Sequence, residues 1–146
     1  MSRLDLPPVW GALAALAIWL WARSVAVIPA PGLAPLGWAL IAVGVALTAW
    51  AAVWFRRMKT PIEPRHTPSA LITAGPYRLS RNPIYRGLIL AVAGWALVCG
   101  ELTALAVAAA YGWLLHVRFA LTEEAVLRQT FGRAFEDWAA RVRWRL

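Results

Sequence analysis

The stretch GPYRLSRNPIYRG, residues 75–87, gathers three arginines, two tyrosines, two prolines and two glycines in a chain otherwise rich in Ala, Leu, Val and Trp. A glycine lets the backbone approach a ligand closely, and the amides of a helix N-terminus attract polar groups. The stretch therefore indicates a binding segment for a polar ligand. Its arginines also have a plain alternative role, because basic residues that flank membrane spans act as topology anchors. The candidate binding residues are Gly75, Pro76, Tyr77, Arg78, Arg81, Asn82, Pro83, Tyr85 and Arg86.

A second polar cluster consists of His116, Glu123 and Glu124. Counted at about 1.5 Å per residue from the turn at residues 100–101, Arg86 and His116 lie at nearly the same depth, roughly 21 to 23 Å away. His116 and Glu123 are seven residues apart, which is two turns, so we expect them on one helix face. Ionisable groups that meet inside a membrane bundle indicate a functional site. A packed histidine and a solvated glutamate pair, Glu124 in particular, remain as alternatives.

Local signals predict how the first stretch is held. Asn82 can cap a helix, and Pro83 suits the first helical position because its missing N–H would have had no partner. A helix is therefore predicted to begin at Pro83. Gly75 and Pro76 mark a turn just before it, so residues 75–82 should form a short bent segment that leads into a helix N-terminus.

The composition predicts a membrane protein. The chain has 146 residues, of which 61% are hydrophobic and 15% charged, with ten tryptophans, more apolar material than a soluble domain of this size can hide. The predicted fold is all-α and polytopic, a single domain over residues 1–146 with four transmembrane helices in two hairpins. The expected spans cover residues 9–28, 36–55, 84–99 and 102–117.

The basic residues predict the orientation. Seven of them lie in residues 56–86 and six in residues 118–146, whereas the two expected outer turns carry none. Because lysine and arginine collect on the cytoplasmic side, the loop 56–83 and both termini should face the cytoplasm, in a membrane of the bacterial inner type. The net charge of +8 falls between apolar blocks rather than along one soluble face, so the expected partners are membrane lipids and not nucleic acid.

Two further expectations concern the rest of the chain. Apolar residues recur every three or four positions after the fourth span, which predicts a C-terminal amphipathic helix over about residues 120–142, on the membrane surface or folded back on the bundle. The lone Cys99 cannot form an intramolecular disulfide, and neither it nor His66 and His116 have metal-ligand spacing. We therefore expect no metal site. The sequence does not predict an oligomeric state.

Taken together, the two motifs resemble the isoprenylcysteine carboxyl methyltransferase family and the related phospholipid methyltransferases. The family pattern is close to G-P-Y-R-x-x-R-[HN]-P-x-Y-x-G, followed by E-E-x-x-L-x-x-x-F-G-x-x-Y-x-x-Y, and the resemblance covers about residues 50–145. Asn82 stands where many relatives have histidine, and Phe135 and Trp138 replace the two tyrosines of the second motif. Matching positions are Gly75, Pro76, Tyr77, Arg78, Arg81, Asn82, Pro83, Tyr85, Gly87, Glu123, Glu124, Leu127, Phe131 and Gly132.

The resemblance implies S-adenosyl-L-methionine as the methyl donor. Glu123 is then the first choice for the cofactor's ammonium, and Arg78 or Arg81 for its carboxylate. Further expected cofactor contacts are Gly75, Pro76, Tyr77, Asn82, Pro83, Tyr85, His116 and Glu124.

The resemblance leaves the acceptor open between an isoprenylcysteine-like carboxyl group, as the family name implies, and a lipid or other lipophilic small molecule. Arg81 or Arg86 would position a carboxylate acceptor, whereas Glu124 would take the proton of an amine. Arg81, Arg86 and Glu123 are thus the expected catalytic residues. The alternative is a non-catalytic membrane scaffold or a transporter-like subunit, although the first two spans carry no carboxylate of the kind that a proton-coupled exporter needs.

Overall fold

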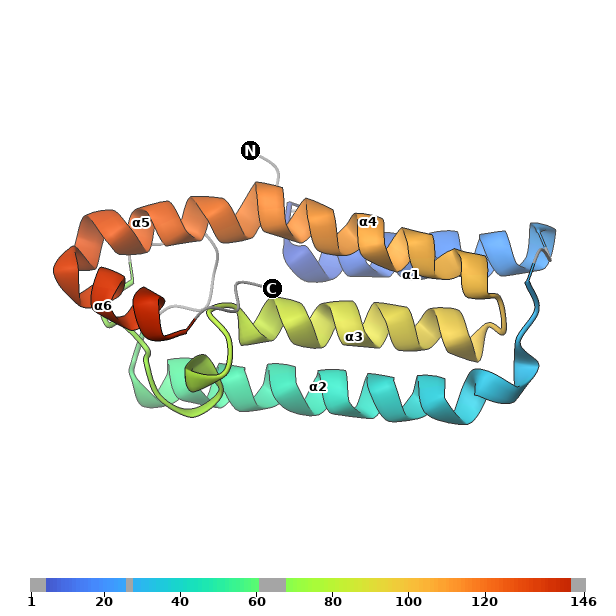
Figure 1. Ribbon diagram of the computed structural model, residues 1–146, viewed down its shortest axis with the longest axis horizontal. Helices are drawn as coiled ribbons and strands as arrows, with labels where there is room; N and C mark the ends of the chain where they lie inside the picture. Colours follow the sequence, from blue (N-terminus) through green and yellow to red (C-terminus); the bar gives the residue numbers. More distant parts are fainter. Residues whose placement is uncertain (1–4, 26–27, 61–67, 143–146) are drawn as a thin grey trace.

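A computed structural model describes residues 5–25, 28–60 and 68–142, and within these ranges the chain is helical and has no β-strand (Figure 1). The predicted all-α class is confirmed. The α-helices are α1 Pro7–Ser24, α2 Ala34–Arg57, α3 Pro83–Val98, α4 Leu105–Leu115, α5 Leu121–Phe131 and α6 Arg133–Arg141. Three short 3₁₀ turns and one π-helical turn join them: η1 Pro31–Leu33, η2 Gly75–Arg78, η3 Leu102–Ala104 and the π turn η4 His116–Ala120.

The helices form an elongated bundle with two unlike ends (Figure 1). Helix α3 packs against α1, α2 and α4, so it is the central element. The turns that join α1 to α2 and α3 to α4 lie together at one end. Helices α5 and α6 and the turn η2 gather at the other end, which we call the head. Both sequence motifs therefore lie in or next to the head.

The outer surface of the bundle is apolar, and the protein is membrane-associated. Pro31–Arg57 and Leu102–Phe131 are long and apolar enough to cross a membrane, and Pro83–Val98 is a shorter apolar helix. Large hydrophobic side chains point outward along the bundle, among them Leu13, Leu16, Trp38, Val43, Val45 and Trp113. Such a surface suits lipid rather than water. Helix α1 begins two residues before the expected span, and part of that span, residues 26–27, lies outside the described residues. The four-span topology stays a prediction.

Glycines bring the backbones of α2 and α3 into contact. A Cβ atom on Gly37 would lie 2.6 Å from the carbonyl oxygen of Gly94, and one on Gly44 would lie 2.4 Å from that of Gly87. The two glycines of each helix are seven residues apart, so each pair lies on one helix face. Close backbone approach through small residues is how helices associate in lipid, where hydrophobic burial gives no driving force. The α2–α3 pair forms the base on which the head is built.

Gly44→Ala is expected to lower the free energy of unfolding by about 1 to 3 kcal/mol, because the new methyl group meets backbone atoms that cannot turn aside. Equilibrium unfolding in mixed detergent micelles measures the change. The matched control is Gly32→Ala, since a Cβ atom there has no neighbour within 4 Å. Equal stability of the two variants would show that the helices do not pack as described.

A buried glutamate holds the two outer turns together. Glu101 is 2% exposed, and its carboxylate accepts hydrogen bonds from the backbone N–H of Ile28 at 3.0 Å and of Thr103 at 3.1 Å. The backbone N–H of Ala30 donates to the carbonyl of Gly100 at 2.7 Å, and residues 29 and 101 form an antiparallel bridge. These contacts link the first hairpin to the second at the end opposite the head.

The tail departs from the prediction of one amphipathic helix over about residues 120–142. Helix α5 instead continues the line of α4 through the π turn and ends at Phe131, and α6 folds back toward η2 (Figure 1). The break falls at Gly132, whose φ of 50° is in the region that favours glycine. Helix α6 alone is amphipathic, since its apolar residues Phe135, Trp138 and Ala139 are buried. The prediction that the tail folds back on the bundle holds for α6.

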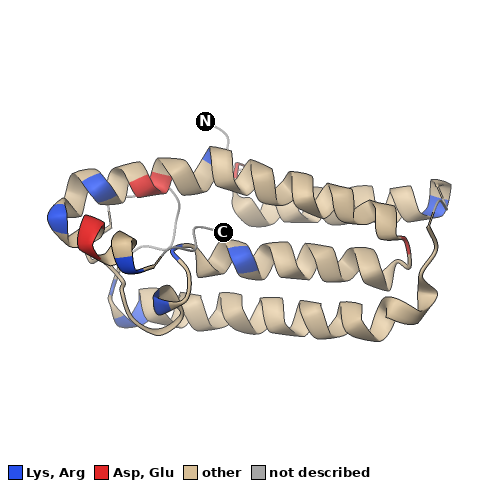
Figure 2. Ribbon diagram, viewed as in Figure 1, with Lys and Arg blue, Asp and Glu red and all other residues tan. Residues whose placement is uncertain are grey.

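Charged residues are concentrated at the head (Figure 2). Within the described residues, Arg23, in the last turn of α1, is the basic residue at the opposite end. This distribution is the one on which the predicted cytoplasmic orientation of the head depends.

Candidate active site

The bent segment before α3 is present as predicted. The turn η2 spans Gly75–Arg78, and α3 begins at Pro83. Gly75 has a φ of 60°, and a Cβ atom on it would lie 2.0 Å from the indole nitrogen of Trp54, so no other residue fits there without displacing that ring. The ring of Tyr77 packs edge-on against Phe55 with centroids 5.9 Å apart. Contacts with α2 thus fix the turn.

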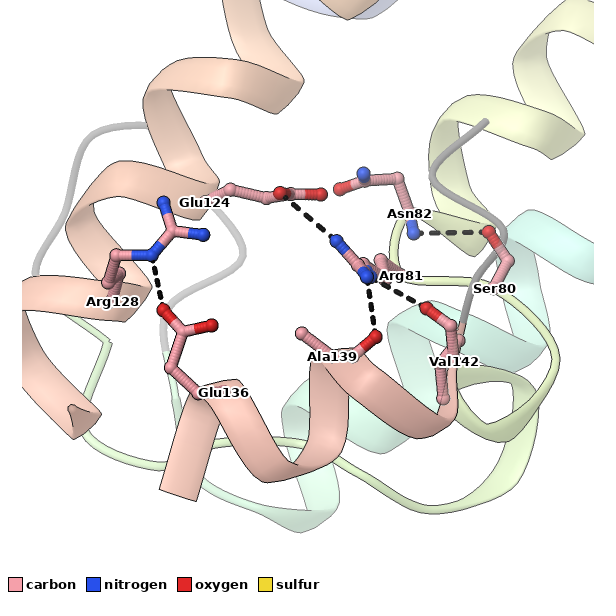
Figure 3. Close-up of polar contacts among 8 residues, drawn as sticks. All are labelled: Ser80, Arg81, Asn82, Glu124, Arg128, Glu136, Ala139 and Val142. Carbon is pink, nitrogen blue, oxygen red and sulfur yellow. Dashed lines mark hydrogen bonds and ion pairs between the residues drawn. The ribbon is translucent and has the colours of Figure 1, made fainter. Parts of the chain in front are cut away.

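Asn82 occupies the position before α3, but its side chain does not cap that helix. Its backbone N–H instead donates to the hydroxyl of Ser80 at 3.2 Å, and its side chain points toward the carboxylate of Glu124 (Figure 3). The predicted helix start is confirmed, whereas the predicted capping bond is wrong.

The π turn η4 aims the glutamate pair at this segment. From η3 through α4 into the π turn, the residues that face the core are at most 4% exposed. They are Ala104, Ala108, Tyr111, Leu115 and Phe119. If the helix continued without interruption, the same spacing would place Thr122 on the buried side and Glu124 on the exposed side. Thr122 is exposed, however, and Glu124 is only 5% exposed. A π turn holds one extra residue and so rotates the following helix by about 100°.

The same rotation separates His116 from Glu123. The expectation that both lie on one helix face is wrong, because His116 begins the π turn and Glu123 follows it. The half-buried ring of His116 packs beside Trp113 with centroids 6.3 Å apart, and Trp113 is 70% exposed on the outer surface. His116 therefore lies on the side of the helix that adjoins the exposed Trp113.

Glu123 accepts a hydrogen bond from one tyrosine of the first motif and acts on the charge environment of another. The buried hydroxyl of Tyr85, in the first turn of α3, donates to the Glu123 carboxylate. Burial, and then the negative charge of Glu123, raise the pKa of the Tyr77 phenol above its usual range. Glu123 itself is half-buried. An oriented carboxylate with one side accessible is able to bind a cationic group.

Glu124 has a different set of contacts, shown in Figure 3. Its Oε2 atom lies 3.4 Å from Nη1 of Arg81, and their side chains are 6% and 11% exposed. The interpretation of Glu124 as part of a solvated helix face is wrong, because the π turn buries it. The two neighbouring carboxylates therefore have different contacts. Glu124 forms an internal ion pair with Arg81, and Glu123 accepts a hydrogen bond from Tyr85.

Arg81 also binds the end of α6. Its Nε donates to the carbonyl oxygen of Val142 at 2.7 Å, and Nη2 donates to that of Ala139 at 2.5 Å (Figure 3). The last carbonyls of a helix have no partner within the helix, and a cation there also suits the helix dipole. All three guanidinium nitrogens of Arg81 thus contact protein groups, which joins α5, α6 and the first motif.

The other predicted arginines differ in exposure. Arg78 is exposed at the end of η2, and Arg86 is half-buried in the first turn of α3. Pro76 and Pro83 are fully buried, so they shape the segment rather than present a surface.

Three contributors to the site escaped the sequence analysis. Trp54 packs over Gly75, Ser80 is 2% exposed under Asn82, and the indole N–H of Trp138 donates to the carbonyl oxygen of Tyr77 at 3.2 Å. Trp138 had a signal, because it occupies a motif position where relatives have tyrosine. Trp54 and Ser80 had no such signal in the sequence, since only the folding of the chain brings them to the site.

The chain is similar to proteins of a known family. The phospholipid methyltransferase family model matches residues 33–134, a range that includes α2, α3, the first motif, the π turn and the second motif as far as residue 134. Two curated relatives, from Oryza sativa subsp. indica and subsp. japonica, are each described as a probable protein-S-isoprenylcysteine O-methyltransferase. Each is 41% identical over 73 residues, which is 49% of this chain and 38% of the relative, so the chain covers less than two fifths of their length. The chain belongs to the phospholipid methyltransferase family.

Proposed function

We propose that the protein transfers a methyl group from S-adenosylmethionine to a lipophilic or amphiphilic acceptor at the cytoplasmic boundary of the membrane. The acceptor group is the carboxyl of an isoprenylcysteine-like molecule or a lipid head group. Membership of a methyltransferase family and the apolar outer surface support the proposal. The observation that carries it is the half-buried carboxylate of Glu123, which Tyr85 orients beside the η2 turn.

The residues at this place fit the chemistry of the cofactor. When bound, S-adenosylmethionine supplies a methyl group on a positively charged sulfur. Glu123 is the counter-charge for its ammonium group, and the exposed Arg78 is the partner for its carboxylate. Tyr77 and Tyr85 are 7% and 5% exposed, so they shape this place and orient its polar groups from within. His116 is left outside this set because the π turn separates it from Glu123.

The remaining residues shape the site rather than react. Arg81 holds Glu124 and the end of α6, in place of the contact with cofactor or acceptor expected from the sequence. We assign it and Glu124 to positioning. Because methyl transfer is an in-line displacement, holding donor and acceptor aligned and away from water accounts for most of the rate increase. Rigid placement of α6 and η2 serves that purpose.

The contacts of Glu124 favour a carboxyl acceptor. An amine must lose a proton, and the ion pair with Arg81 occupies the carboxylate expected to take it. A carboxylate acceptor reacts as its anion and needs a nearby cation instead. Arg86, half-buried in the first turn of α3 and one residue after Tyr85, is the residue that we propose for that contact.

The proposal is tested by calorimetric titration of the purified protein in detergent with S-adenosylmethionine. We expect saturable binding with a dissociation constant on the order of micromolar. The absence of binding by a folded, monodisperse preparation would contradict the proposal and favour a non-catalytic scaffold or a transporter-like subunit.

A further inference from the structure

The head carries a group of exposed basic side chains that the proposed reaction does not use. They belong to the end of α2 and the residue pair after it. We call this group the basic rim, and its members are Arg56, Arg57 and Lys59. We propose that the basic rim binds the anionic phospholipid head groups of the adjacent membrane leaflet.

No carboxylate of the described residues balances the charge of the rim, whereas two arginines elsewhere are paired. Arg118 pairs with Asp5 at 2.9 Å, and Arg128 pairs with Glu136 at 2.5 Å. In the described part of the chain, no carboxylate lies within ion-pair distance of any rim residue. As far as the described residues go, the positive charge of the rim is thus available to an external anion.

Exposed apolar side chains lie beside the basic side chains of the rim. On a surface that faces water they would be unfavourable. Met58, between Arg57 and Lys59, is 41% exposed, and Leu79, which follows the η2 turn packed on α2, is 61% exposed. Basic and apolar side chains side by side suit the boundary between head groups and acyl chains, where each type finds its own surroundings. A soluble acidic partner would match the charge but not these apolar groups.

The position of Arg57 directs the rim toward lipid. Trp50, Val53 and Arg57 follow one another at spacings of three and four, so they lie on one face of α2. Trp50 and Val53 are 46% and 41% exposed on the apolar outer surface, and the Arg57 guanidinium lies 5.6 Å from the ring centre of Trp54. The rim is therefore the continuation of a lipid-facing surface. Each basic residue near an anionic leaflet contributes about a factor of five in binding.

The inference is tested in nanodiscs of phosphatidylcholine alone or mixed with phosphatidylglycerol. Lipids retained by the protein after transfer to detergent are measured by native mass spectrometry. We expect phosphatidylglycerol to be enriched over its share of the disc. The double variant Arg56→Gln/Arg57→Gln should reduce that enrichment by about fivefold or more. The matched control, Arg133→Gln/Arg141→Gln, removes the same charge from exposed positions of α6 and should retain it.

Two results would overturn the inference: no enrichment in the unaltered protein, or equal loss in both double variants, which would indicate net charge alone. Cooperative thermal unfolding in pure phosphatidylcholine discs establishes that both variants are folded. The inference is independent of the proposed reaction, because lipid retention is measured without cofactor or acceptor.

Discussion

Glu123→Gln is expected to weaken the binding of S-adenosylmethionine by about 30- to 1,000-fold, or about 2 to 4 kcal/mol, while the protein stays folded. The substitution removes the proposed counter-charge of the ammonium group from a half-buried position. Glutamine keeps an oxygen that can accept the hydrogen bond of Tyr85, so the local packing is retained. Calorimetric titration measures the affinity, and thermal unfolding of the same sample reports on the fold.

The matched control for this prediction is Glu136→Gln. Its carboxylate is 53% exposed and pairs only with an arginine that is 50% exposed, among the contacts of the described residues. An exposed pair of this kind contributes little, so the control should bind the cofactor as the parent does. If Glu123→Gln bound with the affinity of the parent, the assignment of Glu123 would be wrong.

The second large effect concerns stability. Arg81→Leu is expected to lower the free energy of unfolding by about 3 to 5 kcal/mol, because it leaves the Glu124 carboxylate buried without its cation and two carbonyls of α6 without a donor. Equilibrium unfolding measures the loss. Limited proteolysis should also cut the chain near Gly132 sooner, since α6 is no longer held.

Two further variants separate positioning from ligand contact. Adding Glu124→Leu to Arg81→Leu should restore part of the lost stability, because no charge is then buried alone. Arg81→Lys keeps the charge with fewer donors and should fall between parent and Arg81→Leu. If Arg81→Leu were as stable as the parent and lost only cofactor affinity, then Arg81 would bind the ligand directly, as the sequence motif suggested.

The sequence predicts those elements that depend on local signals. The start of α3 at Pro83 and the turn at Gly75 follow from proline and glycine chemistry, which acts within a few residues. The lengths of α2 and α3 follow from apolar runs. Gly132 was itself a local signal for the break. The amphipathic pattern that continues on both sides of it nevertheless predicted one unbroken helix.

The sequence does not predict features that depend on packing between distant segments. The π turn at residues 116–120 leaves no mark in composition, yet it decides which face carries Glu123 and Glu124. Arg81 contacts carbonyl groups 58 and 61 residues further along the chain. At such a separation in sequence, the residue types do not indicate that the two groups meet. The seven-residue spacing of glycines in α2 and α3 was present in the sequence and would have predicted their close packing.

The most direct test of the central claim is transfer of a labelled methyl group. Purified protein in nanodiscs is incubated with methyl-labelled S-adenosylmethionine and a series of S-prenylated cysteine acceptors with one head group and increasing chain length, and the label in the extracted acceptor is counted. The account predicts transfer that depends on Glu123 and rises with chain length, because binding of the apolar tail helps to fix the reacting carboxyl in line. No transfer to any acceptor, or equal transfer by the parent and Glu123→Gln, would contradict it.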